Sequence, residues 1–176
     1  NGPVGIALDP AGRVIVADTY NDRIRAIGAD GRVETMAGGP RGGPLDGPAH
    51  EAACDTPAGV AADAAGILYV ADTGGDRVAR IDRSGTVATL ALPAAAGAGP
   101  GGLSRPLGIA ASPDGHVYVS DRRAIAELAP DGTARVLAGS RPGFADGPGA
   151  EARFRNPSGL AWAGDGRLAV ADTGNA

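Results

Sequence analysis

The stretch GIALDPAGRVIVADTYNDRI, residues 5–24, decides the fold of this chain because its pattern returns three more times. Each copy begins within a Pro-x-Gly motif, passes through a short apolar segment and a turn that ends in glycine, and closes a second apolar segment on aspartate. The motifs recur at spacings of 54, 49 and 51 residues, at residues 3–5, 57–59, 106–108 and 157–159. Such a period, built from strand-length segments, predicts a repeat architecture.

The first copy predicts four antiparallel strands, at residues 4–8, 13–18, 23–27 and 32–37. The first strand is apolar throughout, which is typical of a strand buried on both faces. The third alternates Arg and Ile, so we expect one of its faces to contact solvent. This gradient indicates the radially arranged blade of a β-propeller, whose first strand lines the axis and whose fourth faces solvent.

We therefore predict an all-β fold, a β-propeller of four-stranded antiparallel blades, of which about 3.5 are present. The predicted blades are residues 3–37, 57–92 and 106–138, with an incomplete fourth blade at 157–176. Long connectors are expected at residues 38–56, 93–105 and 139–156. The turn after the second strand is two residues shorter in the third copy, at Arg122 and Arg123, and is predicted to be tighter.

The pattern Gly-[Ile/Val/Leu]-Ala followed by Gly-x-[Val/Leu]-x-Val-Ala-Asp-Thr-x-Asn-x-Arg-[Ile/Val] resembles the NHL repeat, and residues 5–24 match it most fully. The connector at residues 138–159 is similar to the segments between blades of bacterial NHL repeat-containing proteins, and residues 37–57 repeat its pattern. The resemblance implies a propeller that is six-bladed when complete. We therefore expect this chain to be a fragment of a longer protein.

Composition excludes several classes of function. The net charge of −4 gives no electrostatic footprint for nucleic acid. No apolar stretch is long enough to span a membrane, and the single cysteine, Cys54, excludes an internal disulfide. Cys54 is expected to be unreactive, because no histidine lies near it in the sequence. The 16 basic residues are all arginine, which suggests a GC-rich bacterium but leaves a cytoplasmic or an extracytoplasmic location open.

Antiparallel strand order places the three long connectors and the turns after each second strand on one face of the disc. We expect binding on this loop-rich face, because function on repeat scaffolds tends to lie on the side with long loops. The candidate binding residues are Tyr20, Asn21, Asp22, Asp76, Arg122, Arg123 and Phe144. The Arg122-Arg123 pair is singled out because it breaks the repeat.

An aspartate closes the second strand of each copy, at Asp18, Asp72, Asp121 and Asp172. We expect each carboxylate to bond the backbone amides of its own turn, because catalytic residues seldom recur in every repeat. The alternative is a set of carboxylates converging near the axis, which could bind a calcium ion.

For the other polar residues we predict structural roles within their own segments. Asp22-Arg23 and Asp76-Arg77 are predicted to be surface ion pairs of little energetic weight. Asp46 and Asp146 are predicted to cap a helical turn carrying Glu51 and Glu151. His50 and His116 are expected to be exposed, and Trp162 and Phe154 to pack between blades.

Two functions are compatible with these patterns. The first is a non-catalytic scaffold that binds a protein or a small surface ligand through its loop-rich face, with no cofactor. The second is part of a metal-dependent, gluconolactonase-like lactonase or an NHL-type lyase, whose catalytic residues lie largely outside this segment. The resemblance implies that such enzymes hold a metal in the central channel with Glu, Asp and Asn. Residues 4–8 and 107–111 offer none of these, although calcium in the intact protein stays possible. We prefer the scaffold.

Overall fold

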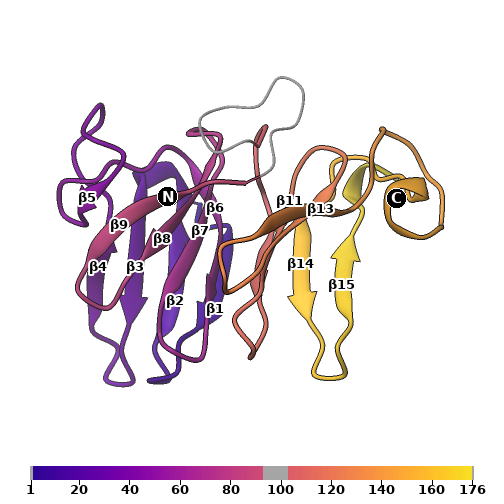
Figure 1. Cartoon of the computed structure of the whole chain (residues 1–176). Coiled ribbons are helices and arrows are strands. Elements are labelled where there is room, and N and C mark those ends of the chain that lie inside the picture. Colours follow the sequence, from indigo (N-terminus) through magenta and orange to yellow (C-terminus); the bar gives the residue numbers. More distant parts are fainter. Residues whose placement is uncertain (1, 93–102, 176) are drawn as a thin grey trace.

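The structure, a computed structural model, describes residues 2–92 and 103–175 and is built almost entirely from β-strands (Figure 1). Each repeat copy forms its own antiparallel sheet, in which consecutive strands are neighbours. The first sheet consists of β1 (Gly5–Leu8), β2 (Val14–Asp18), β3 (Arg23–Ile27) and β4 (Val33–Ala37). The four strands predicted for the first copy are thereby confirmed.

The other copies repeat this arrangement. The second sheet consists of β6 (Pro57–Ala62), β7 (Leu68–Asp72), β8 (Arg77–Ile81) and β9 (Thr86–Leu90), extended by β5 (Gly47–Pro48) from the preceding connector. The third consists of β10 (Ile109–Ala111), β11 (Val117–Ser120), β12 (Ile125–Leu128) and β13 (Ala134–Ala138). The fourth is the pair β14 (Gly159–Trp162) and β15 (Leu168–Ala171). Short 3-10 helices are η1 (Thr19–Asn21), η2 (Gly149–Glu151) and η3 (Thr173–Asn175).

The first strands of successive sheets contact one another, β1 with β6, β6 with β10 and β10 with β14, so the sheets radiate from a common line. The glycine of the Pro-x-Gly motif permits this approach. A Cβ at Gly5 would lie 2.3 Å from the carbonyl oxygen of Ala58, and one at Gly59 would lie 2.4 Å from that of Leu107. A side chain at either glycine would force the inner strands apart. The predicted all-β propeller fold is confirmed.

Aspartate and glycine shape the hairpin that joins the first two strands of a sheet. The Asp9 carboxylate accepts hydrogen bonds from the amides of Ala11 and Arg13, at 3.0 and 2.8 Å. The amide of Gly12, with φ of +77°, donates back to the Asp9 carbonyl. Such Asx-turn geometry explains why the sequence Asp-Pro-Ala-Gly ends the first strand sharply.

The core lies between sheets. One apolar cluster fills the space between the first and second sheets, with Ile15 and Ile24 facing Val60 and Val70. A second cluster lies between the second and third sheets and includes Val119.

Aromatic packing joins the third and fourth sheets. Tyr118 stacks on Trp162 with ring centroids 5.1 Å apart, so Trp162 packs between blades as predicted. Phe154 instead lies within its connector, where its backbone bridges to Pro142.

The expectation that the first strand is buried on both faces is wrong for β1 and right for β6. In β1, Ile6 is 71% exposed and Leu8 is 69% exposed. In β6, every residue from Pro57 to Ala61 is buried. The reason is that β6 packs between β1 and β10, whereas in the described part of the chain β1 has a neighbouring inner strand on one side alone.

Candidate functional site

The connectors at 38–56 and 139–156 and the turns after each second strand lie at one end of the sheets, and the short hairpins lie at the other (Figure 1). Hydrogen bonds join these two kinds of loop. The Gly74 amide donates to the Asp55 carbonyl at 2.8 Å, and the Asn156 amide donates to the Arg122 carbonyl at 2.8 Å. On the loop-rich face expected from strand order, described connectors are therefore hydrogen-bonded to the neighbouring turns.

Carboxylates from two adjacent sheets hold the last residues of the connector before Pro57. Asp72 Oδ1 accepts a hydrogen bond from the Asp55 amide at 2.7 Å. Asp22 Oδ1 accepts one from the Thr56 amide at 2.9 Å. Asp72 ends β7 of the sheet that the connector enters, and Asp22 lies in the turn before β3 of the sheet that it leaves. The pair of carboxylates therefore fixes one blade relative to the next, and we call it a carboxylate clamp.

The clamp recurs at the next connector. Asp121 accepts from the Ser104 amide at 3.2 Å, and Asp76 accepts from the Arg105 amide at 2.7 Å. At the third connector Asp172 accepts from the Arg155 amide at 2.7 Å. No aspartate equivalent to Asp22 exists there, and the Arg122 carbonyl takes its place.

The structural role expected for the aspartates that close each second strand is confirmed for Asp72, Asp121 and Asp172, but bonds to amides of their own turn are found for Asp121 and not for Asp72 or Asp172. Their carboxylates bond amides of the incoming connector, 17 residues away in sequence, instead of bonding only their own turn. Asp121 also accepts from the Arg122 amide. Asp18 binds the side chains of Asn21 and Arg25.

The clamps lie on residues with left-handed backbone conformation. The residues concerned are Asp22, Thr56, Asp76, Arg105 and Asn156, with φ between 50° and 57°. This conformation costs a residue with a Cβ about 1–2 kcal/mol. Hydrogen bonds offset this cost. The amides of Thr56, Arg105 and Asn156 each donate one, and the carboxylates of Asp22 and Asp76 each accept one. The ends of the connectors are therefore held in one conformation.

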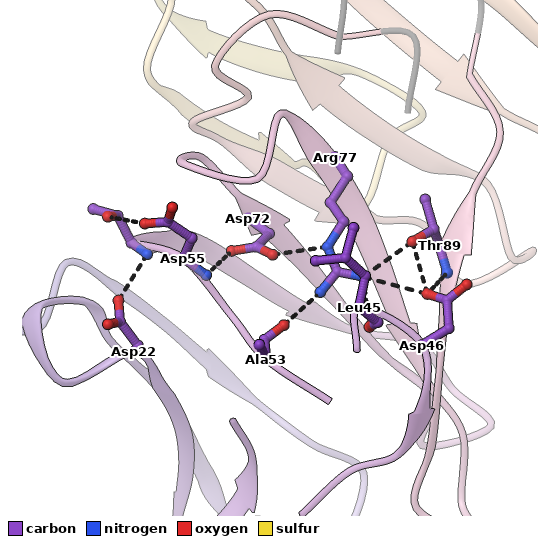
Figure 2. A network of polar contacts seen from close by, with 9 residues as sticks. Asp22, Leu45, Asp46, Ala53, Asp55, Asp72, Arg77 and Thr89 are labelled. Atoms are coloured by element: carbon purple, nitrogen blue, oxygen red, sulfur yellow. Dashed lines mark hydrogen bonds and ion pairs between the residues drawn. The ribbon is translucent and has the colours of Figure 1, made fainter. Parts of the chain in front are cut away.

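Arg77 is the centre of a buried polar network beneath the loop-rich face (Figure 2). Its side chain has no exposed surface, and its Nε donates to Asp72 Oδ2 at 2.8 Å. Its other nitrogens donate to the carbonyls of Leu45 and Ala53, each at 2.8 Å. A buried guanidinium needs such partners because an unpaired buried charge is costly. Arg77 thus fastens the connector at 38–56 to the second sheet.

The prediction that Asp76 and Arg77 form a surface ion pair is therefore wrong. Arg77, the first residue of β8, is buried and bonds Asp72, whereas Asp76 lies in the turn before β8 with left-handed backbone and accepts from the Arg105 amide. Burial raises the pKa of Asp72, while the Asp55 amide and the Arg77 guanidinium act in the opposite direction.

The prediction that Asp22 and Arg23 form a surface ion pair is also wrong. Asp22 is buried, and its Oδ2 accepts from Arg41 Nε at 2.8 Å. The Arg23 guanidinium donates to the Gly39 carbonyl at 2.8 Å. Arg23 and Arg77 thus hold the same connector from two adjacent sheets.

Neither predicted helix cap is found. Asp46 Oδ1 accepts from the amide and the hydroxyl of Thr89, both at 2.8 Å, so it ties the connector to β9. The chain then continues as β5, and Glu51 lies in a turn. Near Asp146, η2 carries Glu151 as expected, but it begins after Pro148 and has no side-chain cap. Pro48 lies in strand β5 and Pro148 has extended backbone, so no helical turn begins directly after either aspartate.

The histidines and the cysteine have unequal surroundings. His50 is exposed as predicted. His116 is half-buried and lies 3.0 Å from Glu127, so the expectation that it is exposed is wrong. Cys54 is buried, and burial raises the pKa of its thiol to about 12, which agrees with the expected lack of reactivity.

The seven candidate residues lie on the loop-rich face, but the structure does not bring them together. Tyr20 is 68% exposed, Phe144 is 77% exposed and Asn21 is also exposed. Asp22 and Asp76 are clamp residues. The shortened turn of the third sheet is tight as predicted, with the Asp121 amide donating to the Ala124 carbonyl at 2.9 Å, and it exposes Arg122 and half-exposes Arg123.

Arg122 shares a hollow of about 320 Å³ with residues from two connector ends. The other lining residues are Arg105, Leu107 and Asn156. Sequence reasoning missed Arg105 and Asn156. The available signal is their position directly before the Pro of two Pro-x-Gly motifs, where the chain enters an inner strand.

An open hollow of about 250 Å³ lies along the inner strands and is lined by residues 4–6, 58–60, 107–109 and 158–160. These residues are glycine, alanine, larger aliphatic residues and Ser158, with no carboxylate among them. Over residues 2–92 and 103–175, no group of three or more His, Cys, Asp or Glu side chains is placed to hold a metal ion. No helix in the same residues is long and apolar enough to cross a membrane.

Comparison with known sequences identifies the repeat. The family model of the NHL repeat matches residues 1–27 and 103–124. NHL repeat-containing protein 2 from Gallus gallus is 37% identical over 81 residues, which cover 46% of this chain and 11% of that protein. The chloroplastic protein SUPPRESSOR OF QUENCHING 1 from Arabidopsis thaliana is 44% identical over 78 residues, 42% of this chain and 7% of that protein. The chain thus spans a small part of the curated relatives that it matches.

Solved structures share the fold over nearly the whole chain. A nidogen–laminin complex contains a similar chain with a TM-score of 0.72, 22% identity and coverage of 97% of this chain and 56% of that one. A gluconolactonase from Xanthomonas campestris has a TM-score of 0.71, 19% identity and coverage of 97% and 54%. A streptogramin B lyase has a TM-score of 0.69, 18% identity and coverage of 99% and 49%. These similarities show a β-propeller fold, and the chain spans about half of each structure.

Proposed function

We propose that this chain, which belongs to the NHL repeat family, is a non-catalytic scaffold that binds a protein or a small ligand through its loop-rich face. The observation that carries the proposal is the exposure of two aromatic side chains, Tyr20 and Phe144, on loops whose backbones are held in place. Tyr20 lies in η1, whose neighbour Asp22 accepts hydrogen bonds from the Thr56 amide and from Arg41, and Phe144 lies in the connector that Asn175 bonds at the Gly143 carbonyl.

Rigid loops with exposed aromatic residues suit recognition. Aromatic side chains contribute large contact areas at low entropic cost, and they are enriched at interfaces. Holding the loops in advance lowers the cost of ordering them on binding. The inner hollow supports the same proposal, because its lining of glycine, aliphatic residues and Ser158 includes no carboxylate, histidine or cysteine side chain.

The alternative is a six-bladed, metal-dependent enzyme of the lactonase or lyase type, with its catalytic residues elsewhere in the whole protein. Similarity to a gluconolactonase at 19% identity supports a shared fold and goes no further. A calcium titration of the intact protein separates the two functions. If the protein is a scaffold, calcium should not raise its melting temperature, and it should not hydrolyse lactones. If the channel holds a metal site, calcium should raise the melting temperature and the protein should hydrolyse lactones.

Affinity capture followed by binding measurements on the purified partner tests the scaffold directly. The double variant Tyr20→Ala/Phe144→Ala removes the exposed aromatic residues, and Val136→Ala removes an exposed apolar residue of β13 as a matched control. We expect the double variant to lose at least about tenfold in affinity, as is usual for aromatic hot spots, and the control to bind normally. Equal binding by all three proteins would contradict a role for this face.

A further inference from the structure

We propose that the hollow shared by Arg105, Arg122 and Asn156 binds an oxyanion group, a carboxylate or a phosphate, of a small ligand. The inference rests on the proposed function, because it names the chemistry of a ligand for the loop-rich face. The hollow measures about 320 Å³, and Leu107 completes its lining. It lies where the connectors into β10 and β14 meet the shortened turn between β11 and β12.

The two guanidinium groups have no protein partner within residues 2–92 and 103–175. Arg105 is bonded through its backbone amide to Asp76, and Arg122 is bonded through its backbone amide and carbonyl. Residues 93–102 read PAAAGAGPGG and bring no acidic side chain to neutralise them. By contrast, Arg13, Arg77 and Arg135 are each paired with a carboxylate. Arg105 and Arg122 therefore keep their full donor capacity for a ligand.

The backbone beneath these side chains is fixed. Arg105 and Asn156 both have left-handed conformation, and their amides are clamped by Asp76 and by the Arg122 carbonyl at 2.7 and 2.8 Å. The Asn156 side chain is exposed and has no hydrogen-bond partner in the described part of the chain, so its amide group is a further donor. A site whose backbone is set in advance loses less entropy when the ligand binds.

Charge decides the class of ligand. Two arginines and no acidic residue line the hollow. Guanidinium groups form paired, charge-assisted hydrogen bonds with carboxylates and phosphates. The adjoining hollow, which Arg105 also lines, contains Asp76 and is therefore not suited to an anion.

The repeat shows that this charge is specific to one position in the fold. At the first two connectors the clamp residue from the preceding sheet is an aspartate, Asp22 or Asp76. At the third connector the shortened turn deletes that aspartate, and its amide acceptor becomes the Arg122 carbonyl. The structural bond is thus kept while a negative side chain is replaced by a positive one, so the guanidinium is not needed for the fold.

Titration of the intact protein with inorganic phosphate and, separately, with citrate tests the inference by calorimetry. The variants are Arg105→Gln and Arg122→Gln, with Arg141→Gln as the control, because Arg141 is an exposed arginine of the connector at 139–156. We expect saturable binding of at least one anion by the wild-type protein. Each hollow variant should bind at least about tenfold more weakly, and the control should bind normally.

The two titrations distinguish the sources of the anionic group. Saturation by phosphate alone assigns a phosphate-bearing ligand, and saturation by citrate alone assigns a carboxylic acid; both outcomes support the site. Absence of saturable binding, or equal weakening by Arg141→Gln, would overturn it. Melting temperatures of the variants verify that each is folded. Because these measurements need no protein partner, their failure would leave the affinity capture with Tyr20 and Phe144 variants unaffected.

Discussion

The first and second sheets have nearly the same sequence pattern but different burial, and the contrast shows what a neighbouring sheet contributes. Residues 54 apart occupy the same position, so Ile6 corresponds to Val60 and Arg25 to Ala79. Val60 and Ala79 are buried in the core between the first two sheets, whereas Ile6 is largely exposed. Burial in this fold is therefore set by the adjoining sheet and not by the strand itself.

The buried network should show the largest difference between the two sheets. We expect Arg77→Met to lower the free energy of unfolding by about 3–5 kcal/mol, because it leaves Asp72 buried without its cation. The equivalent change, Arg23→Met, should cost about 1–2 kcal/mol, because it removes hydrogen bonds to carbonyl groups and no buried ion pair. Urea unfolding of both variants measures the difference, and equal losses would show that the buried pair has no special weight.

Apolar truncation at equivalent positions should give the next largest difference. Val60→Ala removes two buried methyl groups and should cost about 2 kcal/mol. Ile6→Ala removes more carbon but should change stability by no more than about 0.5 kcal/mol, because Ile6 is exposed. Thermal unfolding of the two variants provides the measurement. A large loss for Ile6→Ala would mean that its face is covered in solution.

The carboxylate clamp between the two sheets should make a smaller contribution. Asp22→Ala leaves the Thr56 amide without its acceptor and should cost about 1–2 kcal/mol. Asp22 also forms an ion pair with the exposed Arg41, so Arg41→Ala serves as the control and should cost no more than about 0.5 kcal/mol. Chemical unfolding distinguishes the amide bond from the ion pair. Equal costs would assign the effect to the ion pair.

The last prediction concerns the reactivity of the Cys54 thiol, which lies in the core between these two sheets, and involves no change in stability. Burial raises the pKa of its thiol to about 12, so the thiolate is scarce at pH 8, where an ordinary cysteine is partly ionised. We expect no labelling of the folded protein by a thiol reagent within minutes, and rapid labelling in urea. Fast labelling of the native protein would show that the two sheets separate readily.

The strands and hairpins could be predicted from sequence because their signals are local. Glycine at Gly12 and alternating residues in β3 act through neighbours in the chain. The roles of Asp22 and Arg77 could not be predicted in this way, because their partners lie in connectors 34 and 24 residues away. The dipeptide Asp76-Arg77 has the sequence pattern of an exposed ion pair. The connector at 38–56 covers Arg77, and no local pattern in the sequence indicates this contact.

The candidate site was predictable in part for the same reason. Strand order placed the loop-rich face correctly, and the break in the repeat singled out Arg122. Arg105 and Asn156 were missed because their place before the Pro of a Pro-x-Gly motif marks the start of an inner strand and does not indicate that both lie beside Arg122.

The short strand β5 has a consequence for self-association. It pairs with β9, the outermost repeat strand of the second sheet, and so occupies backbone groups that another chain could otherwise bind. Within the described residues, β4 and β13 have no such partner on their outer side, and each exposes a valine, Val33 or Val136. Glu34 and Arg135 place a charge on each of these strands, which discourages edge-to-edge pairing. The outer edge of the second sheet is thus protected by an added strand, and the outer edges of the first and third sheets are protected by charged side chains.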